Sequence, residues 1–317
     1  MSCLGGRAAR AIGAAAPLRK PFSPALFLVP GDYNSATPKK AVVALKSEGY
    51  RRGRPRGPTV AALDMYRIRS MKSFACRVVP RFFAPVQLSP GAEIELPERV
   101  TRHCAVLRLR RGDAVILFNG EGGEFSAELM RVSSGDARAR VISMQTPERE
   151  SPLAIALAQC VSSGDRMDTT LQKSTELGVS RIVPIASERS VVRLSSNRAD
   201  RRVERWRNVV IAACEQCGRN HVPEVAAITD FAAFLSQASG DGLRVLLAPD
   251  SDRDLKQLEP PREVTLLVGP EGGLAPDERQ RAERSGFVPI RFGPRVLRTE
   301  TAPLAAIAAM QALWGDC

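Results

Sequence analysis

Two glycine-proline segments late in the chain hold the residue types best suited to bind a small ligand. They are Gly269-Pro270-Glu271-Gly272-Gly273 and Gly293-Pro294-Arg295-Val296-Leu297-Arg298-Thr299-Glu300-Thr301-Ala302. Each follows a short apolar run, at 264–268 and at 287–292, that is typical of a buried strand. In an open parallel sheet, ligands bind outside the carboxyl ends of the strands. We therefore expect the two segments to surround one molecule, mainly with main-chain groups.

The glycines of these segments have two interpretations. Gly269, Gly272, Gly273 and Gly293 allow close approach of the backbone to a ligand and permit a positive φ. For a single turn, a purely structural role is the better interpretation. Two such turns at adjacent strand ends favour a ligand site.

The second segment also brings opposite charges together. Arg298 and Glu300 stand where an Ala-rich helix at 301–314 is expected to begin. Backbone N–H groups in a first helical turn lack helical partners. The pair is therefore either an ion pair at a helix terminus or part of a reactive site, and the spacing alone does not separate these two interpretations.

The elements that must position these segments alternate between strand and helix. Strands are expected at 153–161, 181–185, 243–248, 264–268 and 287–292, and helices at 165–177, 198–217, 229–237, 276–285 and 301–314. Strands alternating with helices predict a mostly parallel α/β sheet. Thr229 or Asp230 is the expected cap of the helix at 229–237.

Residues 81–145 have a different pattern, with short strands expected at 82–86, 92–96, 114–118, 124–132 and 137–144 and a helix at 98–109. This predicts a small β-barrel with one helix, ending at the polar, proline-bounded stretch 146–152. Around it gather arginines, whose planar guanidinium groups suit phosphate. A solvated charged face explains the same cluster equally well. The cluster comprises Arg81, Arg99, Arg102, Arg108, Arg110 and Arg111, with His103.

Residues 1–78 differ from the rest in charge. They hold 15 of the 46 Lys and Arg residues but only 3 of the 34 Asp and Glu residues, so the whole net charge of +12 falls there. Three interpretations fit this composition: a transit peptide, a basic tail that binds nucleic acid, or a start codon assigned too far upstream. We favour the third interpretation, because a domain is expected to begin at Val79-Pro80-Arg81. A measurement of the intact mass of the natural protein would test this choice.

Several classes of protein are disfavoured. The seven cysteines are scattered, which favours a reducing compartment over a disulfide framework. Cys214, Cys217 and His221 suggest zinc, but a structural zinc needs about four ligands, and the chain has two histidines and no second cysteine pair. Phosphate-loop, dinucleotide-binding and serine-hydrolase motifs are missing. No run approaches the roughly 18 apolar residues of a membrane span, so a soluble protein is expected.

Five motifs in order resemble the RsmE family over about three quarters of the chain, from Pro80 onward; residues 1–78 are the departure from it. The motifs are Gln172-Lys173-Ser174-Thr175-Glu176-Leu177-Gly178-Val179, Ser187-Glu188-Arg189-Ser190, Ala212-Ala213-Cys214-Glu215-Gln216-Cys217-Gly218-Arg219, and the two glycine-proline segments. Members of this family are SPOUT-class methyltransferases that modify N3 of a uridine, at position 1498, in 16S ribosomal RNA.

The resemblance implies a fold, a cofactor and partners. The expected fold is a PUA-like, RNA-binding β-barrel at 79–148 followed at 149–317 by a SPOUT methyltransferase domain with a C-terminal trefoil knot. The expected cofactor is S-adenosylmethionine, and no metal is needed. The expected partners are 16S ribosomal RNA in the small ribosomal subunit and a second copy of the chain, in the cytoplasm and away from membranes.

The resemblance and the residues together give candidate sites. Arg298 is expected to stabilise the uridine anion, and Glu300 to order the loop or take the proton; Arg298→Ala is expected to lower turnover far more than cofactor affinity. Arg81, Arg108 and Arg111 are the candidates for RNA phosphates, and Glu215, Gln216 and Arg219 for the dimer interface or the rim of the site. The cofactor-binding candidates are Leu247, Val268, Gly269, Pro270, Glu271, Gly272, Phe292, Gly293, Val296, Leu297, Thr301 and Ala302.

Two rival functions remain open. One is a SPOUT enzyme that modifies a different RNA, and the other is a ribosome-assembly protein that binds RNA without catalysis. The intact glycine-proline segments count against the second.

Overall fold

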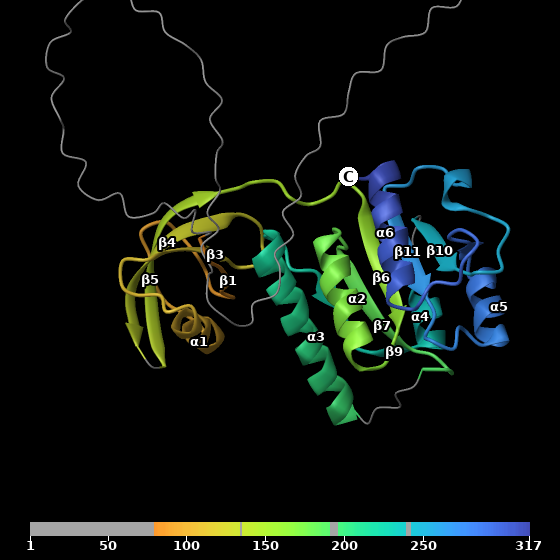
Figure 1. Ribbon diagram of the computed structural model, residues 1–317, viewed down its shortest axis with the longest axis horizontal. Coiled ribbons are helices and arrows are strands. Elements are labelled where there is room, and N and C mark those ends of the chain that lie inside the picture. The colour runs from red at the N-terminus through yellow and green to blue at the C-terminus, as the bar shows by residue number, and fades with distance from the viewer. Residues whose placement is uncertain (1–78, 134, 191–195, 239–241) are drawn as a thin grey trace, which may run out of the picture. The chain divides into compact units, whose positions relative to one another are not determined.

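The computed structural model describes residues 79–133, 135–190, 196–238 and 242–317 (Figure 1). All of them belong to one compact unit, Ser70–Cys317. The expected basic extension at 1–78 lies outside the described residues. None of the described helices is long and apolar enough to cross a membrane.

The first part of the described chain is a five-stranded sheet with one helix. Its strands are β1 (Arg81–Phe83), β2 (Glu93–Glu95), β3 (Ala114–Phe118), β4 (Glu124–Ser133) and β5 (Asp136–Gln145), in the order β1-β3-β4-β5-β2. β1 and β3 are parallel and the other pairs antiparallel. Along β4, Phe125, Ala127 and Leu129 are buried while their neighbours face outward, as period-two alternation predicts. α1 (Glu98–Val106) covers this core through Val100 and Cys104.

The helix is shorter than the sequence pattern predicted. It ends at Val106, with Leu107 as the C-cap, rather than at 109. Arg108 follows with φ of 55°, a conformation that non-glycine residues adopt only rarely and that cannot continue a right-handed helix. The chain therefore turns away from the helix axis and exposes Val106 and Leu107.

The second part is a parallel sheet in the order β12-β10-β11-β6-β7-β8. Every pair in it is parallel, as the alternation of strands and helices predicted. The short strand β9 pairs with β7 beside β8. The strands are β6 (Ala154–Cys160), β7 (Arg181–Ala186), β8 (Glu224–Val225), β9 (Thr229–Asp230), β10 (Leu243–Leu247), β11 (Glu263–Val268) and β12 (Val288–Ile290).

Helices cover both faces of this sheet (Figure 1). The side chains of β6 contribute to two separate apolar clusters. Ile155 and Leu157 belong to one of them, and Ala158 and Cys160 belong to the other. A strand buried on both faces is almost continuously apolar, and in β6 Gln159 is the exception. The first cluster also receives side chains from α2 (Gly164–Glu176), α3 (Ser196–Cys217) and α6 (Thr301–Trp314), and the second from α4 (Phe231–Gln237) and α5 (Pro276–Arg284).

Some short elements were not predicted from the sequence. The strands β8 and β9 and the 3₁₀ turn η1 (Leu255–Gln257) are too short to show a periodicity. The helix expected at 229–237 begins at Phe231, because Thr229 and Asp230 pair with β7. Asp230 is its N-cap, with the side chain accepting a hydrogen bond from the Ala233 N–H over 2.9 Å.

Candidate active site

The two glycine-proline segments form loops at the carboxyl ends of β11 and β12. β10 lies between these strands, so the expectation of adjacent strand ends was wrong, and the end of β10 adds Leu246, Leu247 and Ala248 to the site. The loops and this strand end surround a cavity of about 500 Å³. That volume falls within the range of small-molecule sites, roughly 300–1,000 Å³.

Ten of the twelve residues proposed from the sequence to bind a cofactor line this cavity. They are Leu247, Val268, Gly269, Pro270, Glu271, Gly272, Phe292, Val296, Leu297 and Ala302. Gly293 and Thr301 do not line it. Gly293 has φ of 67°, so it turns the chain at the start of the second loop, where a side chain would be strained. Thr301 opens α6, and its N–H donates to the carbonyl oxygen of Arg298 over 2.9 Å.

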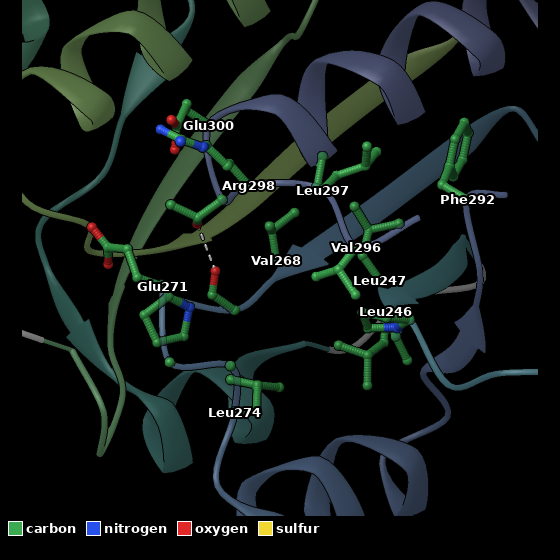
Figure 2. A pocket seen from close by; sticks show the side chains of 18 of the residues that line it. Leu246, Leu247, Val268, Glu271, Leu274, Phe292, Val296, Leu297, Arg298 and Glu300 are labelled. Atoms are coloured by element: carbon green, nitrogen blue, oxygen red, sulfur yellow. Dashed lines mark hydrogen bonds between the residues drawn. The ribbon is translucent and has the colours of Figure 1, made fainter. Parts of the chain in front are cut away.

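Hydrogen bonds join the two loops to the sheet. The Thr299 hydroxyl donates to the carbonyl oxygen of Gly269 over 2.8 Å, shown as the dashed line in Figure 2. Gln159, at the end of β6, donates through Nε2 to the Thr299 hydroxyl oxygen over 3.2 Å. Gln159 and Thr299 are both buried. Because a buried polar contact of this kind is costly to break, it fixes the second loop against the first.

The cavity has an apolar side and a charged side (Figure 2). Leu246, Leu247, Val296, Leu297 and Phe292 gather on one side, and Glu271, Arg298 and Glu300 on the other. An apolar slot with main-chain N–H and C=O groups at its edge suits a flat heterocycle. The charged side suits a polar or ionic group of the same ligand or of a second one.

Glu271 is the best anchored of these charges. Its Oε1 accepts hydrogen bonds from the Ser163 N–H, the Ser163 hydroxyl and Nη1 of Arg166, each over 3.0 Å. Burial alone would raise the pKa of this carboxyl, but the hydrogen bonds from Ser163 and Arg166 outweigh burial and lower the pKa below the usual glutamate value. Glu271 is therefore an anion that holds the first loop to the start of α2.

Arg298 and Glu300 do not form the ion pair that one interpretation predicted. Glu300 lies near a different arginine, with its Oε2 3.9 Å from Nε of Arg166. Arg298 is exposed and lines the cavity, and it has no carboxylate partner among the described residues. A guanidinium without a partner in a ligand cavity is available for an anion that the ligand brings.

Further lining residues were missed from the sequence. Arg166, Arg189, Asp250 and Arg279 come from four separate segments. Arg279 donates to Asp250, and this hydrogen bond lowers the pKa of the Asp250 carboxyl. Arg166 and Arg189 each follow a strand end, after β6 and β7, and this position in a parallel sheet is the signal that could have identified them.

Arg81, one of the residues expected to bind RNA phosphate, contacts other groups of the protein. Arg81 binds Glu124, the carbonyl oxygen of Gly218 and Oδ1 of Asn220, and its guanidinium lies 5.1 Å from the centre of the Phe118 ring. Its side chain is only 11% exposed. These partners occupy donors of the guanidinium that a phosphate would bind, so the contacts favour a structural role for Arg81, and its expected contact with RNA stays a prediction. Arg108 and Arg111 are exposed and have no carboxylate partner within the described chain.

The polar cluster at the end of α3 also has structural partners. Glu215 accepts hydrogen bonds from the Phe83 N–H over 3.0 Å and from Arg99 over 2.8 Å. Arg219 is buried, binds Glu150 and donates to the carbonyl oxygens of Thr175 and Val179. Arg219 therefore stabilises the end of α2, and neither of these side chains lines the cavity.

The cysteine pair belongs to a helix end. Cys214 is buried in the core, burial raises the pKa of its thiol to about 12, and α3 stops at Cys217 before Gly218, whose φ is 91°. A thiol with so high a pKa is a poor metal ligand at neutral pH. No group of three metal-ligating side chains occurs in the part of the chain that the structure describes.

Comparisons with known proteins agree with this architecture. A family model described as an RNA methyltransferase domain matches residues 149–311, and one described as an RNA methyltransferase PUA domain matches residues 96–142. A ribosomal RNA small subunit methyltransferase E from Buchnera aphidicola is 32% identical over 240 residues, covering 75% of this chain and 98% of the relative.

Two solved structures resemble it closely. A ribosomal RNA small subunit methyltransferase E from Neisseria gonorrhoeae, bound to S-adenosyl methionine, is 44% identical with a TM-score of 0.72, over 75% of this chain and 99% of that one. A protein from Legionella pneumophila in complex with SAM is 38% identical with a TM-score of 0.74, over 76% of this chain and 100% of that one. The chain therefore belongs to the family of RNA methyltransferases that includes ribosomal RNA small subunit methyltransferase E.

Proposed function

We propose that this protein transfers a methyl group from S-adenosylmethionine to N3 of a uridine in 16S ribosomal RNA of the small ribosomal subunit, at the family position 1498. The observation that supports this most strongly is the cavity at the ends of β10, β11 and β12, closed by the contact between Thr299 and Gly269. The likeness of the chain to a relative whose crystal structure contains S-adenosyl methionine supports the choice of cofactor.

The residues of the cavity fit this cofactor. Adenine has a flat apolar face, which the leucine and valine side chains accommodate, and polar edges that main-chain groups of the loops can match. A β carbon on Gly269 would lie 3.2 Å from the Leu274 nitrogen, tighter than most such contacts, so glycine lets the two ends of this loop approach each other closely. Leu247, Val268, Phe292, Val296 and Leu297 are the residues proposed to hold the adenosyl group.

The proposed methyl transfer depends on alignment of the reacting atoms and on electrostatic stabilisation more than on a covalent intermediate with the enzyme. The cofactor supplies an activated methyl group with a good leaving group. Arg298 is proposed to donate hydrogen bonds to O2 or O4 of the uridine, and so to favour loss of the N3 proton. Glu300 is proposed to take that proton or to order the loop. Holding the reacting atoms in line then lowers the barrier to transfer.

We further propose a role for each of the two domains, an oligomeric state and a cellular location. Residues 79–148 form the PUA-like RNA-binding domain, with Arg108 and Arg111 on RNA phosphates, and residues 149–317 form the methyltransferase domain. The second domain carries the trefoil knot of the SPOUT class. The protein acts as a homodimer in the cytoplasm.

The direct test is methyl transfer to isolated small ribosomal subunits, with the modified nucleoside identified by mass spectrometry. We expect 3-methyluridine at the family position, and none with protein or cofactor omitted. A methyl group on another RNA or another atom would contradict the proposed substrate. Binding of the RNA without any transfer would favour a protein that has lost catalysis.

A further inference from the structure

A turn at Ser187–Ser190 follows β7 and has no part in the proposed chemistry. It closes on itself, because the Ser190 N–H donates to the Ser187 carbonyl oxygen over 3.0 Å and the Ser187 N–H donates to the Ser190 hydroxyl oxygen over 3.1 Å. The two hydroxyl oxygens also lie 2.8 Å apart, within hydrogen-bond distance. The turn therefore has a defined backbone shape of its own.

A buried carboxylate anchors this turn to the rest of the domain. Glu278, on α5, is only 3% exposed. Its Oε1 accepts a hydrogen bond from the Glu188 N–H over 2.8 Å, and its Oε2 accepts one from the Ala275 N–H over 3.1 Å. Because a buried carboxylate left without donors is costly, these two bonds fix the position of the turn.

The anchored turn places Arg189 at the cavity. Nη1 of Arg189 donates to the carbonyl oxygen of Gly272 over 3.0 Å, and its Cβ and Cδ lie 3.6 Å from the place that a β carbon on Gly272 would take. Arg189 lines the cavity, is exposed, and has no carboxylate partner within the described residues. A guanidinium has five N–H donors, so most of those of Arg189 remain available.

The charges around the cavity do not balance. Five arginines line it, Arg166, Arg189, Arg279, Arg295 and Arg298, against three carboxylates, Asp250, Glu271 and Glu300, which leaves an excess of two positive charges. S-adenosylmethionine carries a sulfonium, an ammonium and one carboxylate, so its binding increases this excess. A second ligand with negative charge offsets this excess, and the phosphodiester groups of RNA carry such charge.

We propose that Arg189 binds a phosphate of the RNA backbone next to the target nucleotide, and so positions the substrate at the mouth of the cavity. This inference rests on the proposed function. The planar fork of arginine matches the oxygens of a phosphate. The contact of Arg189 with Gly272 orders the side chain in advance, which reduces the entropy that RNA binding must overcome.

The experiment compares Arg189→Gln with Arg284→Gln. Arg284 is exposed on α5 and does not line the cavity, so its variant loses the same charge elsewhere. Wild-type methyl transfer is confirmed first. The affinity for an RNA transcript that holds the target uridine is then measured across a series of salt concentrations, and that for S-adenosylmethionine by calorimetry.

We expect Arg189→Gln to weaken RNA binding at low salt by about tenfold and to reduce the slope of log affinity against log salt by about one. Its melting temperature and its affinity for S-adenosylmethionine are expected to match those of Arg284→Gln. Arg189→Lys is expected to recover the slope, because it restores the charge, and only part of the affinity.

Two results would overturn the inference while leaving the proposed function in place. One is a salt slope for Arg189→Gln equal to that of Arg284→Gln. The other is weaker binding of S-adenosylmethionine with unchanged RNA binding, which would assign Arg189 to the cofactor carboxylate or to support of the Gly272 loop. Failure of the wild-type protein to bind the transcript and transfer a methyl group would overturn both.

Discussion

The hydroxyl group of Thr299 donates to the carbonyl oxygen of Gly269 over 2.8 Å, and this contact connects loops that follow two strands separated by β10. Thr299 in turn accepts a hydrogen bond from Gln159 on β6. One threonine therefore links the ends of three strands, β6, β11 and β12, around the cavity.

Thr299→Val removes this hydroxyl and keeps the shape of the side chain. We expect the free energy of unfolding to fall by about 1–3 kcal/mol, because the Gly269 carbonyl and the Gln159 amide lose a buried partner. The affinity for S-adenosylmethionine is expected to fall roughly tenfold, equivalent to about 1.4 kcal/mol. Urea denaturation and calorimetry measure the two effects. The exposed Thr146→Val serves as control, and equal cofactor affinity in both variants would contradict the proposed role of the contact.

Arg298→Ala tests the catalytic assignment. Turnover is expected to fall roughly 10²–10³-fold, the usual loss on removing a hydrogen-bond donor to a developing anion. The Kd for S-adenosylmethionine is expected to stay near the wild-type value, because the cavity lining is otherwise intact. Arg262→Ala, just before the amino end of β11, removes the same charge at the opposite edge of the sheet. Wild-type turnover in Arg298→Ala would show that the assignment is wrong.

Acid sensitivity is predicted for the contact between Glu124 and its two arginines. Burial would raise the pKa of Glu124, but hydrogen bonds from Arg149 and Arg81 outweigh burial and lower the pKa below the usual glutamate value. A lowered pKa in the folded state adds stability above that usual value, and this stability is lost as the pH falls through the lowered pKa. The melting temperatures of the wild type and Glu124→Gln are therefore expected to differ at pH 7 and to converge as the pH falls through the lowered pKa of Glu124. A difference that persists unchanged in acid would contradict this.

Arg219 gives a prediction about stability alone. Arg219→Ala leaves Glu150 and two carbonyl oxygens without their donor in a buried place, and the expected cost is about 3–5 kcal/mol in the free energy of unfolding. Arg181→Ala removes an exposed ion pair with Glu224 and is expected to cost less than about 1 kcal/mol. Urea denaturation measures both, and equal losses would show that burial does not govern the effect.

The regular elements and the cavity loops could be predicted because their signals are local. Apolar runs marked the central strands, and a glycine-proline pair marked each loop. Most of the proposed cofactor residues consequently line the cavity. The insertion of β10 between β11 and β12 is a property of the sheet order, which no local pattern contains.

The role of Arg81 could not be predicted for the same reason. Its partners, Glu124 and Gly218, stand 43 and 137 residues away in the sequence. An arginine that lies among other arginines in the sequence indicates a charged surface, and only the folded chain shows which of them is enclosed. Arg189 is the converse case, since its position after β7 was a weak signal and its contact in the cavity, Gly272, stands 83 residues later in the sequence.

The place of α6 in the chain has a consequence for synthesis. This helix begins at Thr301, directly after the second loop, and its Gln311 donates to the Leu177 carbonyl oxygen over 2.9 Å and accepts from Ser151 over 2.7 Å. Domains form from the amino-terminal side as a nascent chain leaves the ribosome. The strands up to β11 emerge before the second loop and Gln311, so the cofactor cavity is not complete until that loop and α6 have followed them. A newly made molecule therefore gains the ability to bind its cofactor only after α6 has been synthesised.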